Sequence, residues 1–263
     1  MSDLPLIVLI HAFPTDGSLW HHQTEALEDK GYRVLTPHLP GFGAGAGGRG
    51  AVPAWPMADY SMESLARFVR DIIVKEAGSG GAGRAIVGGC SMGGCVLLGL
   101  LRHFPEVVRG AMFMDCRAED DTPEARANRL KSIATIEAEG NIRLLVEAML
   151  PRLLSSNAAP ELREELRGLM MRQSPQGVMG IQYALAQRPN ETALLAELQI
   201  PVLMLVGAED ITSPPSVMMA MFAQLRAGVG TLVQIAQAGH LPMLEAPERV
   251  TEAMGAFLQT CGQ

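Results

Sequence analysis

Six short stretches of the chain are apolar almost without interruption, which is the pattern of strands that are buried on both faces of a sheet. These stretches are Leu4–Ile10, Arg33–Pro37, Ala85–Gly89, Gly110–Asp115, Val202–Val206 and Thr231–Ile235. Helical patterns lie between most of them, over Trp20–Lys30, Met62–Ala77, Met92–His103, Ser216–Arg226 and Pro247–Gln259. Because strands and helices alternate, the sequence predicts an α/β fold in which helices flank a mostly parallel sheet.

The alternation stops between Cys116 and Leu195, where the pattern predicts four helices in succession and no strand. The first of these helices is expected to open at Asp121-Thr122-Pro123, with a capping residue and a proline in its first turn, and to end at Gly140. A helical block inserted into an α/β domain is expected to cover the sheet edge where the flanking strands end. The sequence therefore predicts an α/β core of residues 1–117 and 196–263 and a helical lid of residues 118–195.

Composition and charge limit the class of protein. Apolar residues make up 48% of the 263 residues and charged residues 19%, so the chain can bury a large core. The formal net charge of −7 argues against a nucleic-acid or anionic-membrane partner. No stretch approaches the roughly 18 apolar residues of a membrane helix, and the N-terminus lacks the features of a signal peptide. We therefore expect a cytoplasmic protein that acts on a small molecule.

Ser91 lies in a glycine-rich stretch that reads IVGGCSMGGCVL. A nucleophile at a sharp turn from strand to helix has a positive φ, which crowds the residues two positions before and two positions after it. Ser91 has Gly89 and Gly93 at these positions, whereas Cys90 and Cys95 each lack one of the two glycines. A predicted strand precedes Ser91 and a predicted helix follows it. We therefore predict that Ser91 is a nucleophile and that the two cysteines are packing thiols.

A serine hydroxyl becomes a good nucleophile when a base takes its proton and an acid orients that base. In a parallel sheet such partners follow the carboxyl ends of later strands. His240 follows the last predicted strand and Asp210 follows the one before it, which gives the chain order serine, acid, histidine. Asp115, at the end of the fourth predicted strand, is the alternative acid, and Glu209 is expected to point elsewhere.

The other histidines are weaker candidates for the base. Three of them lie in helical patterns and one lies in a loop after a strand: His21, His22, His103 and His38. His11, after the first predicted strand, is expected to brace its own loop by hydrogen bonds. An oxyanion formed next to Ser91 needs two fixed N–H donors. We predict these donors to be the backbone N–H of Met92, at the start of the helix, and that of Phe13.

These segments together resemble a known family, the α/β-hydrolase fold, and specifically its small-lid bacterial branch. That branch includes carboxylesterases, cofactor-free haloperoxidases (perhydrolases) and 3-oxoadipate enol-lactonases. The similarity extends almost from end to end and rests on HAFPTDGSLW, TPHLPGFG, GCSMGG, MDCRAEDDTPEARANR, VGAEDITSPP and AGHLPMLEAPERV. The resemblance implies that Ser91, Asp210 and His240 form a catalytic triad, and that Phe13 and Met92 supply the oxyanion hole. It also implies that the family's N-terminal antiparallel hairpin is missing, which leaves about six strands.

A serine nucleophile with a histidine–aspartate pair and an oxyanion hole is typical of acyl transfer, usually to water. The sequence contains no metal-ligand spacing, phosphate-binding loop or cofactor motif, so we expect no cofactor. We expect the inner surface of the lid to be apolar, although helical stripes of this kind also fit a plain core. The predicted pocket residues are Met149, Met179, Tyr183, Ile211 and Leu241. Such a pocket favours small to medium, uncharged acyl groups.

The preferred interpretation is therefore a carboxylesterase that forms an acyl-enzyme. An enol-lactonase is the first alternative, but it must bind a carboxylate, and Arg117 is the one basic residue that the sequence places near the site. Cleavage of other lactones or of C–C bonds, and acyl transfer to peroxide or another acceptor, remain open. A ligand-binding protein without catalysis is a remote alternative, since such a protein has no need of the complete set Ser91, Asp210 and His240.

Overall fold

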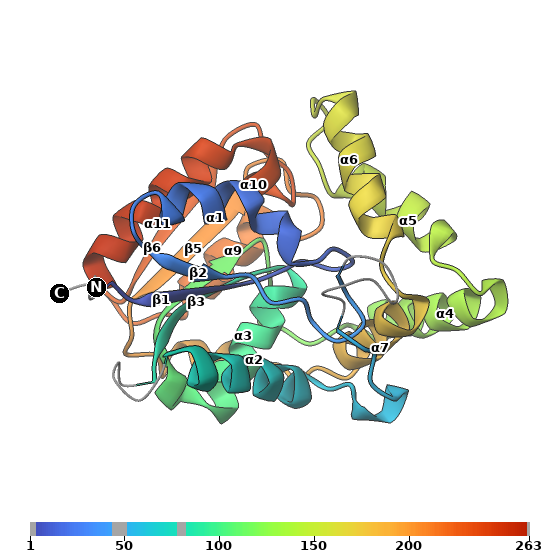
Figure 1. The fold of residues 1–263 in the computed structure, drawn as a ribbon, viewed down its shortest axis with the longest axis horizontal. Coiled ribbons are helices and arrows are strands. Elements are labelled where there is room, and N and C mark those ends of the chain that lie inside the picture. The colour runs from blue at the N-terminus through green and yellow to red at the C-terminus, as the bar shows by residue number, and fades with distance from the viewer. Residues whose placement is uncertain (1–3, 44–51, 78–82, 262–263) are drawn as a thin grey trace.

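The protein contains a six-stranded sheet in which each pair of neighbouring strands is parallel, with the order β2-β1-β3-β4-β5-β6 (Figure 1). The computed structural model describes residues 4–43, 52–77 and 83–261. The strands are β1 (Leu6–Ile10), β2 (Arg33–Leu35), β3 (Ala85–Cys90), β4 (Val108–Met114), β5 (Val202–Gly207) and β6 (Gly230–Ile235). The predicted α/β class and six strands are confirmed, and the described chain enters β1 without a preceding strand.

Helices cover both faces of this sheet. Figure 1 shows α1 (His21–Glu28) and α11 (Pro247–Cys261) on one face and α2 (Met62–Ala77) and α3 (Met92–His103) on the other. Two shorter helices, α9 (Pro215–Phe222) and α10 (Pro242–Glu245), follow β5 and β6. Every residue of β1, β3 and β5 is buried, which explains why these strands read as continuous apolar runs. No helix in the described residues is long and apolar enough to cross a membrane.

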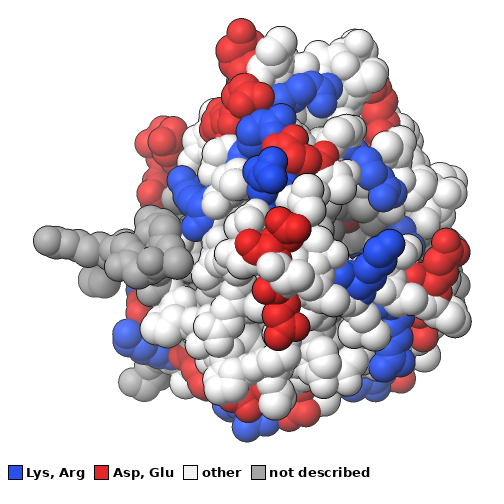
Figure 2. All heavy atoms as spheres, turned by 90° about the vertical axis from the view of Figure 1, so that its right-hand side faces the viewer, with Lys and Arg blue, Asp and Glu red and all other residues white. Residues whose placement is uncertain are grey.

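Between β4 and β5 the described chain forms helices joined by loops, with no strand among them. They are α4 (Pro123–Glu139), α5 (Arg143–Met149), α6 (Pro160–Met171), α7 (Pro175–Ala186) and the short α8 (Thr192–Leu195). Thr122 caps α4 by accepting a hydrogen bond from the N–H of Ala125, and Gly140 ends it with a φ of 68°. We call residues 118–195 the insertion. It lies at the end of the sheet away from both chain termini, and basic and acidic side chains alternate over that side of the molecule (Figures 1 and 2).

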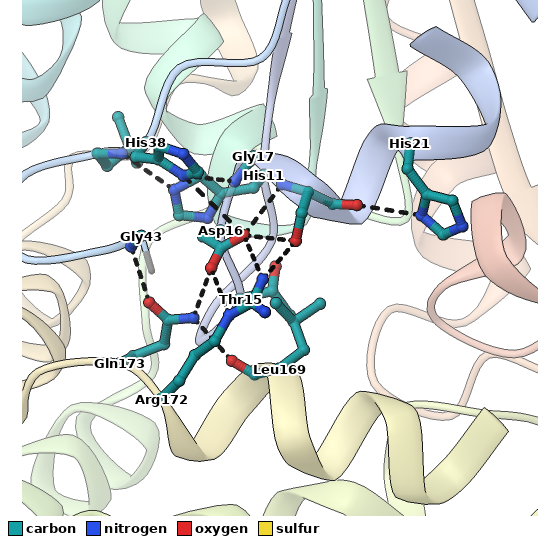
Figure 3. Close-up of polar contacts among 12 residues, drawn as sticks. His11, Thr15, Asp16, Gly17, His21, His38, Gly43, Leu169, Arg172 and Gln173 are labelled. Carbon is teal, nitrogen blue, oxygen red and sulfur yellow. Dashed lines mark hydrogen bonds and ion pairs between the residues drawn. The ribbon is translucent and has the colours of Figure 1, made fainter. Parts of the chain in front are cut away.

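A buried carboxylate fastens the insertion to the loop after β1. Asp16 is fully buried in that loop, and both of its oxygens accept hydrogen bonds from Arg172 and Gln173, between α6 and α7 (Figure 3). The distances are 3.0 Å from Arg172 Nε and 2.9 Å from Gln173 Nε2 to Asp16 Oδ2. Ser18 adds its N–H and hydroxyl, and Gln173 Oε1 accepts from the N–H of Gly43. One carboxylate therefore joins two parts of the chain that are more than 150 positions apart.

These contacts set the charge of Asp16. Burial alone would raise the pKa of Asp16, but the hydrogen bonds from Arg172, Ser18 and Gln173 outweigh it and leave the pKa well below its usual range. The Nδ1 atom of His38 lies 3.9 Å from Asp16 Oδ1 and adds an ion pair when this histidine is protonated. Because the folded-state pKa is depressed, the stabilisation is present above the unfolded-state pKa and is lost as the pH falls below it.

We therefore expect Asp16→Asn to lower the free energy of unfolding at pH 7 by about 1–3 kcal/mol, because buried donors lose a charged acceptor. Urea unfolding of the variant and the wild type between pH 3 and pH 8 measures this difference. It should begin to shrink below about pH 4, because the unfolded wild-type chain takes up a proton on Asp16 there while the folded chain still keeps the carboxylate charged. The control is Asp29→Asn, since Asp29 is exposed and has no side-chain partner among the described residues. An equal effect of both substitutions would contradict the role of Asp16.

Candidate active site

Ser91 lies at the turn between β3 and α3, at the carboxyl end of the sheet. Its φ is 52° and its ψ is −113°, so the serine occupies the positive-φ turn that the sequence predicts. A Cβ atom on Gly89 would lie 2.2 Å from the carbonyl oxygen of Gly93, and one on Gly93 would lie 2.3 Å from that of Ile10. Both positions therefore require glycine, for the steric reason that singled out Ser91.

His240 and Asp210 meet at the same end of the sheet. His240 lies in the turn between β6 and α10, Asp210 follows β5, and both side chains are buried. The Nδ1 atom of His240 lies 2.8 Å from Asp210 Oδ2. The other oxygen of Asp210 accepts hydrogen bonds from the backbone N–H groups of Thr212, at 2.7 Å, and Ser213, at 3.0 Å. These two bonds fix the carboxylate so that Oδ2 faces the imidazole.

The charge of Asp210 is favoured despite its burial. Burial raises the pKa of this carboxyl, but the hydrogen bond and charge of His240 outweigh that effect, and the N–H groups of Ser213 and Thr212 add to them. The pKa of Asp210 therefore lies below its ordinary value. At neutral pH the imidazole faces a carboxylate, which orients the ring and would stabilise a positive charge on it.

Asp115, the alternative acid, lies directly after β4 with a φ of 46° and is fully buried. Its Oδ1 atom accepts a hydrogen bond of 2.8 Å from the N–H of Gly207. Asp115, Asp210 and His240 each contribute one polar atom to a cluster whose atoms lie within 4.8 Å of one another. Burial, followed by the charge of Asp210, raises the pKa of Asp115 well above its ordinary value and so favours its protonated form. The hydrogen-bond partner of His240 is Asp210, whose carboxylate accepts from Nδ1, and not Asp115.

His11 braces the loop that contains Phe13. The imidazole of His11 is fully buried, with Nδ1 at 3.0 Å from the carbonyl oxygen of Ala12 and Nε2 accepting from the N–H of Leu39 at 3.1 Å. Burial lowers the pKa of His11 to about 4, so the ring is neutral and can donate at one nitrogen while it accepts at the other. Phe13 and Met92, the two predicted oxyanion positions, line the same cavity as Ser91.

That cavity has a volume of about 560 Å³ and lies between the sheet and the insertion. Ser91 and His240 are both in its wall. The wall also contains polar and charged residues of the insertion and its neighbourhood: Arg117, Asp121, Asn128, Arg129, Ser132, Arg152, Gln182 and Arg188. The inner surface of the insertion is therefore mixed, because Leu145, Ala148, Met149, Leu153 and Leu185 line the cavity beside these polar residues.

The predicted pocket residues are corrected accordingly. Met149 lines the cavity, but Met179, Tyr183, Ile211 and Leu241 do not. Leu241 is fully buried in the core, whereas Ile211 is 62% exposed on the surface. On α7 the face that reaches the cavity carries Gln182 and Leu185, and Met179 packs against the core.

The cysteines near Ser91 are poor nucleophiles. Cys90, Cys95 and Cys116 are buried and free, and burial is the main cause that raises the pKa of each thiol. Cys95 and Cys116 do line the cavity, but a thiol that keeps its proton reacts slowly.

The main residues that sequence reasoning missed are Arg129, Arg152 and Arg188. The helical pattern predicts the helices that carry or flank them but not how those helices dock. A signal was available in the spacing, because Asn128, Arg129 and Ser132 break the apolar stripe of their helix with polar residues on neighbouring turns.

A family model described as alpha/beta hydrolase fold matches residues 5–247 of the chain. Among curated proteins, the pyrethroid hydrolase of Sphingobium wenxiniae is 29% identical over 266 residues, which cover 95% of this chain and 86% of that protein. Among solved structures, a thermophilic esterase from Thermogutta terrifontis with malate bound is 34% identical. Its TM-score is 0.88, and the match covers 98% of this chain and 91% of that one.

The enol-lactonase of Burkholderia xenovorans LB400 shares the fold, with a TM-score of 0.82 at 22% identity and a match over 98% of this chain and 92% of that one. The family match and these bacterial relatives agree with the resemblance that the sequence motifs carry. The chain belongs to the α/β-hydrolase fold family.

Proposed function

We propose that the protein is a serine hydrolase that cleaves carboxylic esters through an acyl-enzyme. The observation that carries the proposal is that His240, held at 2.8 Å from Asp210, lines the same cavity as Ser91 at its glycine-flanked turn. Esters are the substrate class because a serine, an imidazole and a carboxylate, together with backbone N–H donors, are the groups that acyl transfer needs.

In the proposed reaction His240 Nε2 takes the proton of the Ser91 hydroxyl while Oγ attacks the carbonyl carbon. The carbonyl oxygen becomes an oxyanion, which the N–H groups of Phe13 and Met92 stabilise. Collapse of this intermediate breaks the bond to the leaving oxygen, which takes the proton from His240, and the acyl group stays on Ser91. Water then repeats the attack with His240 as base, which releases the acid and restores the hydroxyl.

The two buried carboxyl groups have different roles in this proposal. Asp210 is charged and supports the imidazolium that forms in each step. Asp115 is protonated, and its bond to the N–H of Gly207 holds the end of β5 close to Asp210. Asp115 is therefore a positioning residue that touches neither the substrate nor the reacting atoms.

The names of the relatives support hydrolysis and leave the substrate open. The pyrethroid hydrolase and the thermophilic esterase suggest an ester, and a lactone is an internal ester that the same three residues would open. The enol-lactonase is therefore kept as the alternative. We expect a small-molecule substrate and no cofactor.

The first prediction concerns the nucleophile. Ser91→Ala should lower the turnover of 4-nitrophenyl esters, tested from acetate to laurate, by at least about 10³-fold, because the three residues act as a unit. Cys95→Ser is the matched control, since Cys95 lies in the same cavity wall and should be replaceable within a few-fold. Circular dichroism of both variants checks the fold. A loss of turnover in Cys95→Ser alone would reassign the nucleophile.

The second prediction separates the two acids. Asp210→Asn should lower kcat by up to about 10⁴-fold, because the amide no longer holds the imidazole in the required tautomer and charge. Asp115→Asn should stay within about tenfold of the wild type, because an amide resembles the protonated carboxyl and asparagine tolerates a positive φ. The measurement is kcat for a short-chain 4-nitrophenyl ester. The reverse order of the two effects would make Asp115 the acid of the triad.

A further inference from the structure

The cavity beside Ser91 is basic, although the protein as a whole is acidic. Among the described residues, its wall contains four arginines against a single carboxylate, that of Asp121, in a chain whose formal net charge is −7. The four are Arg117, Arg129, Arg152 and Arg188. A cleft lined by charges of one sign concentrates its field and attracts ligands of the opposite sign.

Two of these arginines are held in place by the same carboxylate. Asp121 Oδ2 accepts from Arg129 Nε and Asp121 Oδ1 accepts from Arg188 Nη1, each at 2.6 Å. Arg129 also donates from Nη1 to Gln182 Oε1, and Arg188 donates from Nε to the carbonyl oxygen of Glu119. The Arg188 side chain is only 5% exposed and that of Arg129 is 26% exposed. Both guanidinium groups are therefore fixed before any ligand arrives.

Each fixed arginine keeps donors that the protein does not use. Among the described residues, the Nη2 atoms of Arg129 and Arg188 have no hydrogen-bond partner, and neither atom is sealed away from solvent. Within the described part of the chain, the Arg117 side chain donates from Nη2 alone, to the carbonyl oxygen of Thr212 at 2.7 Å. Asp121 neutralises one of the pair Arg129 and Arg188, which leaves an excess of positive charge in the wall.

Arg152 differs from the other three. Its side chain is exposed and has neither a hydrogen bond nor an ion pair within the described part of the chain. It is the arginine whose replacement disturbs the fewest contacts of the folded protein. A substitution of Arg152 therefore tests ligand binding with little effect on the folded structure.

We propose that the substrate of this cavity carries a carboxylate, so that it is an anionic ester or lactone that these arginines bind through its free acid group. A carboxylate is favoured over a phosphate because the wall already binds one carboxylate, that of Asp121, between two guanidinium groups. The reaction of such a substrate rests on the proposed function, whereas the binding of its acid group does not. The preference for uncharged acyl groups, which followed from an expected apolar lid, is replaced by this proposal.

The first test measures binding without catalysis, by calorimetry on Ser91→Ala. Succinate should bind, its neutral analogue succinamide should not, and binding should weaken between 50 mM and 500 mM NaCl as salt screens the charges. Adding Arg152→Gln or Arg129→Gln should weaken succinate binding roughly tenfold to a hundredfold, the range expected for hydrogen bonds to a charged group. Inorganic phosphate is the competing probe, and tighter binding of phosphate than of succinate would overturn the carboxylate assignment.

The matched control is Arg126→Gln. Arg126 lies on α4 like Arg129, is exposed like Arg152, and its side chain has no partner among the described residues and no place in the cavity wall. It removes the same charge, so it should change succinate binding by less than twofold. Equal weakening by Arg126→Gln and Arg152→Gln would mean that net charge alone attracts the anion, and the proposed site would fall.

The second test measures turnover with two esters of equal acyl length, mono-4-nitrophenyl adipate and 4-nitrophenyl hexanoate. The wild type should show a kcat/KM at least tenfold higher for the anionic ester, and Arg152→Gln should reduce that ratio. Turnover of the hexanoate with no preference for the adipate would overturn the anionic substrate and keep the esterase. Succinate binding with no turnover of either ester would overturn the esterase and keep the anion site.

Discussion

The turn at Ser91 depends on backbone segments that pass one another with no room for a side chain. Gly89 approaches Gly93 within the turn, and Gly93 approaches the carbonyl oxygen of Ile10 at the end of β1. Because β1 leads directly into the loop of His11 and Phe13, the contact that makes the turn possible also brings that loop beside the serine. The relative position of Ser91 and Phe13, the proposed nucleophile and oxyanion donor, is thus determined by the backbones of two neighbouring strands, with few side chains involved.

Three carboxyl groups near the cavity show how surroundings decide charge. Asp210 is buried but charged, because an imidazole and two backbone N–H groups face it. Asp115 is buried beside that charge, and both the burial and the charge raise its pKa and favour its protonated form. In Asp121 burial raises the pKa, but Arg129 and Arg188 outweigh it and hold the pKa below its ordinary value. The same functional group therefore accepts a hydrogen bond from the imidazole in Asp210, is favoured in its neutral form in Asp115, and holds two guanidinium groups in place in Asp121.

Features set by local sequence were predictable. The apolar runs of β1, β3 and β5 predicted a sheet covered on both faces, and the glycines beside Ser91 predicted its turn. His240 and Asp210 could be found because parallel strands bring the residues that follow them to one edge. Their contact with each other, and the pairing of Asp16 with Arg172, join distant positions and became visible only in the folded chain.

The sequence predicted the helices of the insertion but not which of their side chains face the cavity. The spacing within α4 and α7 does not say which of their faces meets the sheet, so Met179 and Tyr183 were placed in the cavity and Arg129 and Arg188 were not. The charge state of Asp115 was also beyond sequence reasoning, because it depends on burial and on the distance to Asp210. Both failures concern how elements dock, which short-range patterns do not encode.

The hydrogen bonds of Asp16 limit how the insertion of this protein can be redesigned. The insertion cannot be treated as a module that is exchanged by cutting at its two ends, because its α6–α7 junction also holds the loop that precedes α1. A chimaera that receives a foreign insertion without counterparts of Arg172 and Gln173 would keep a buried carboxylate that has lost its arginine partner. A design that exchanges the insertion must therefore also choose a new residue for position 16, which lies far along the chain from either boundary of the insertion.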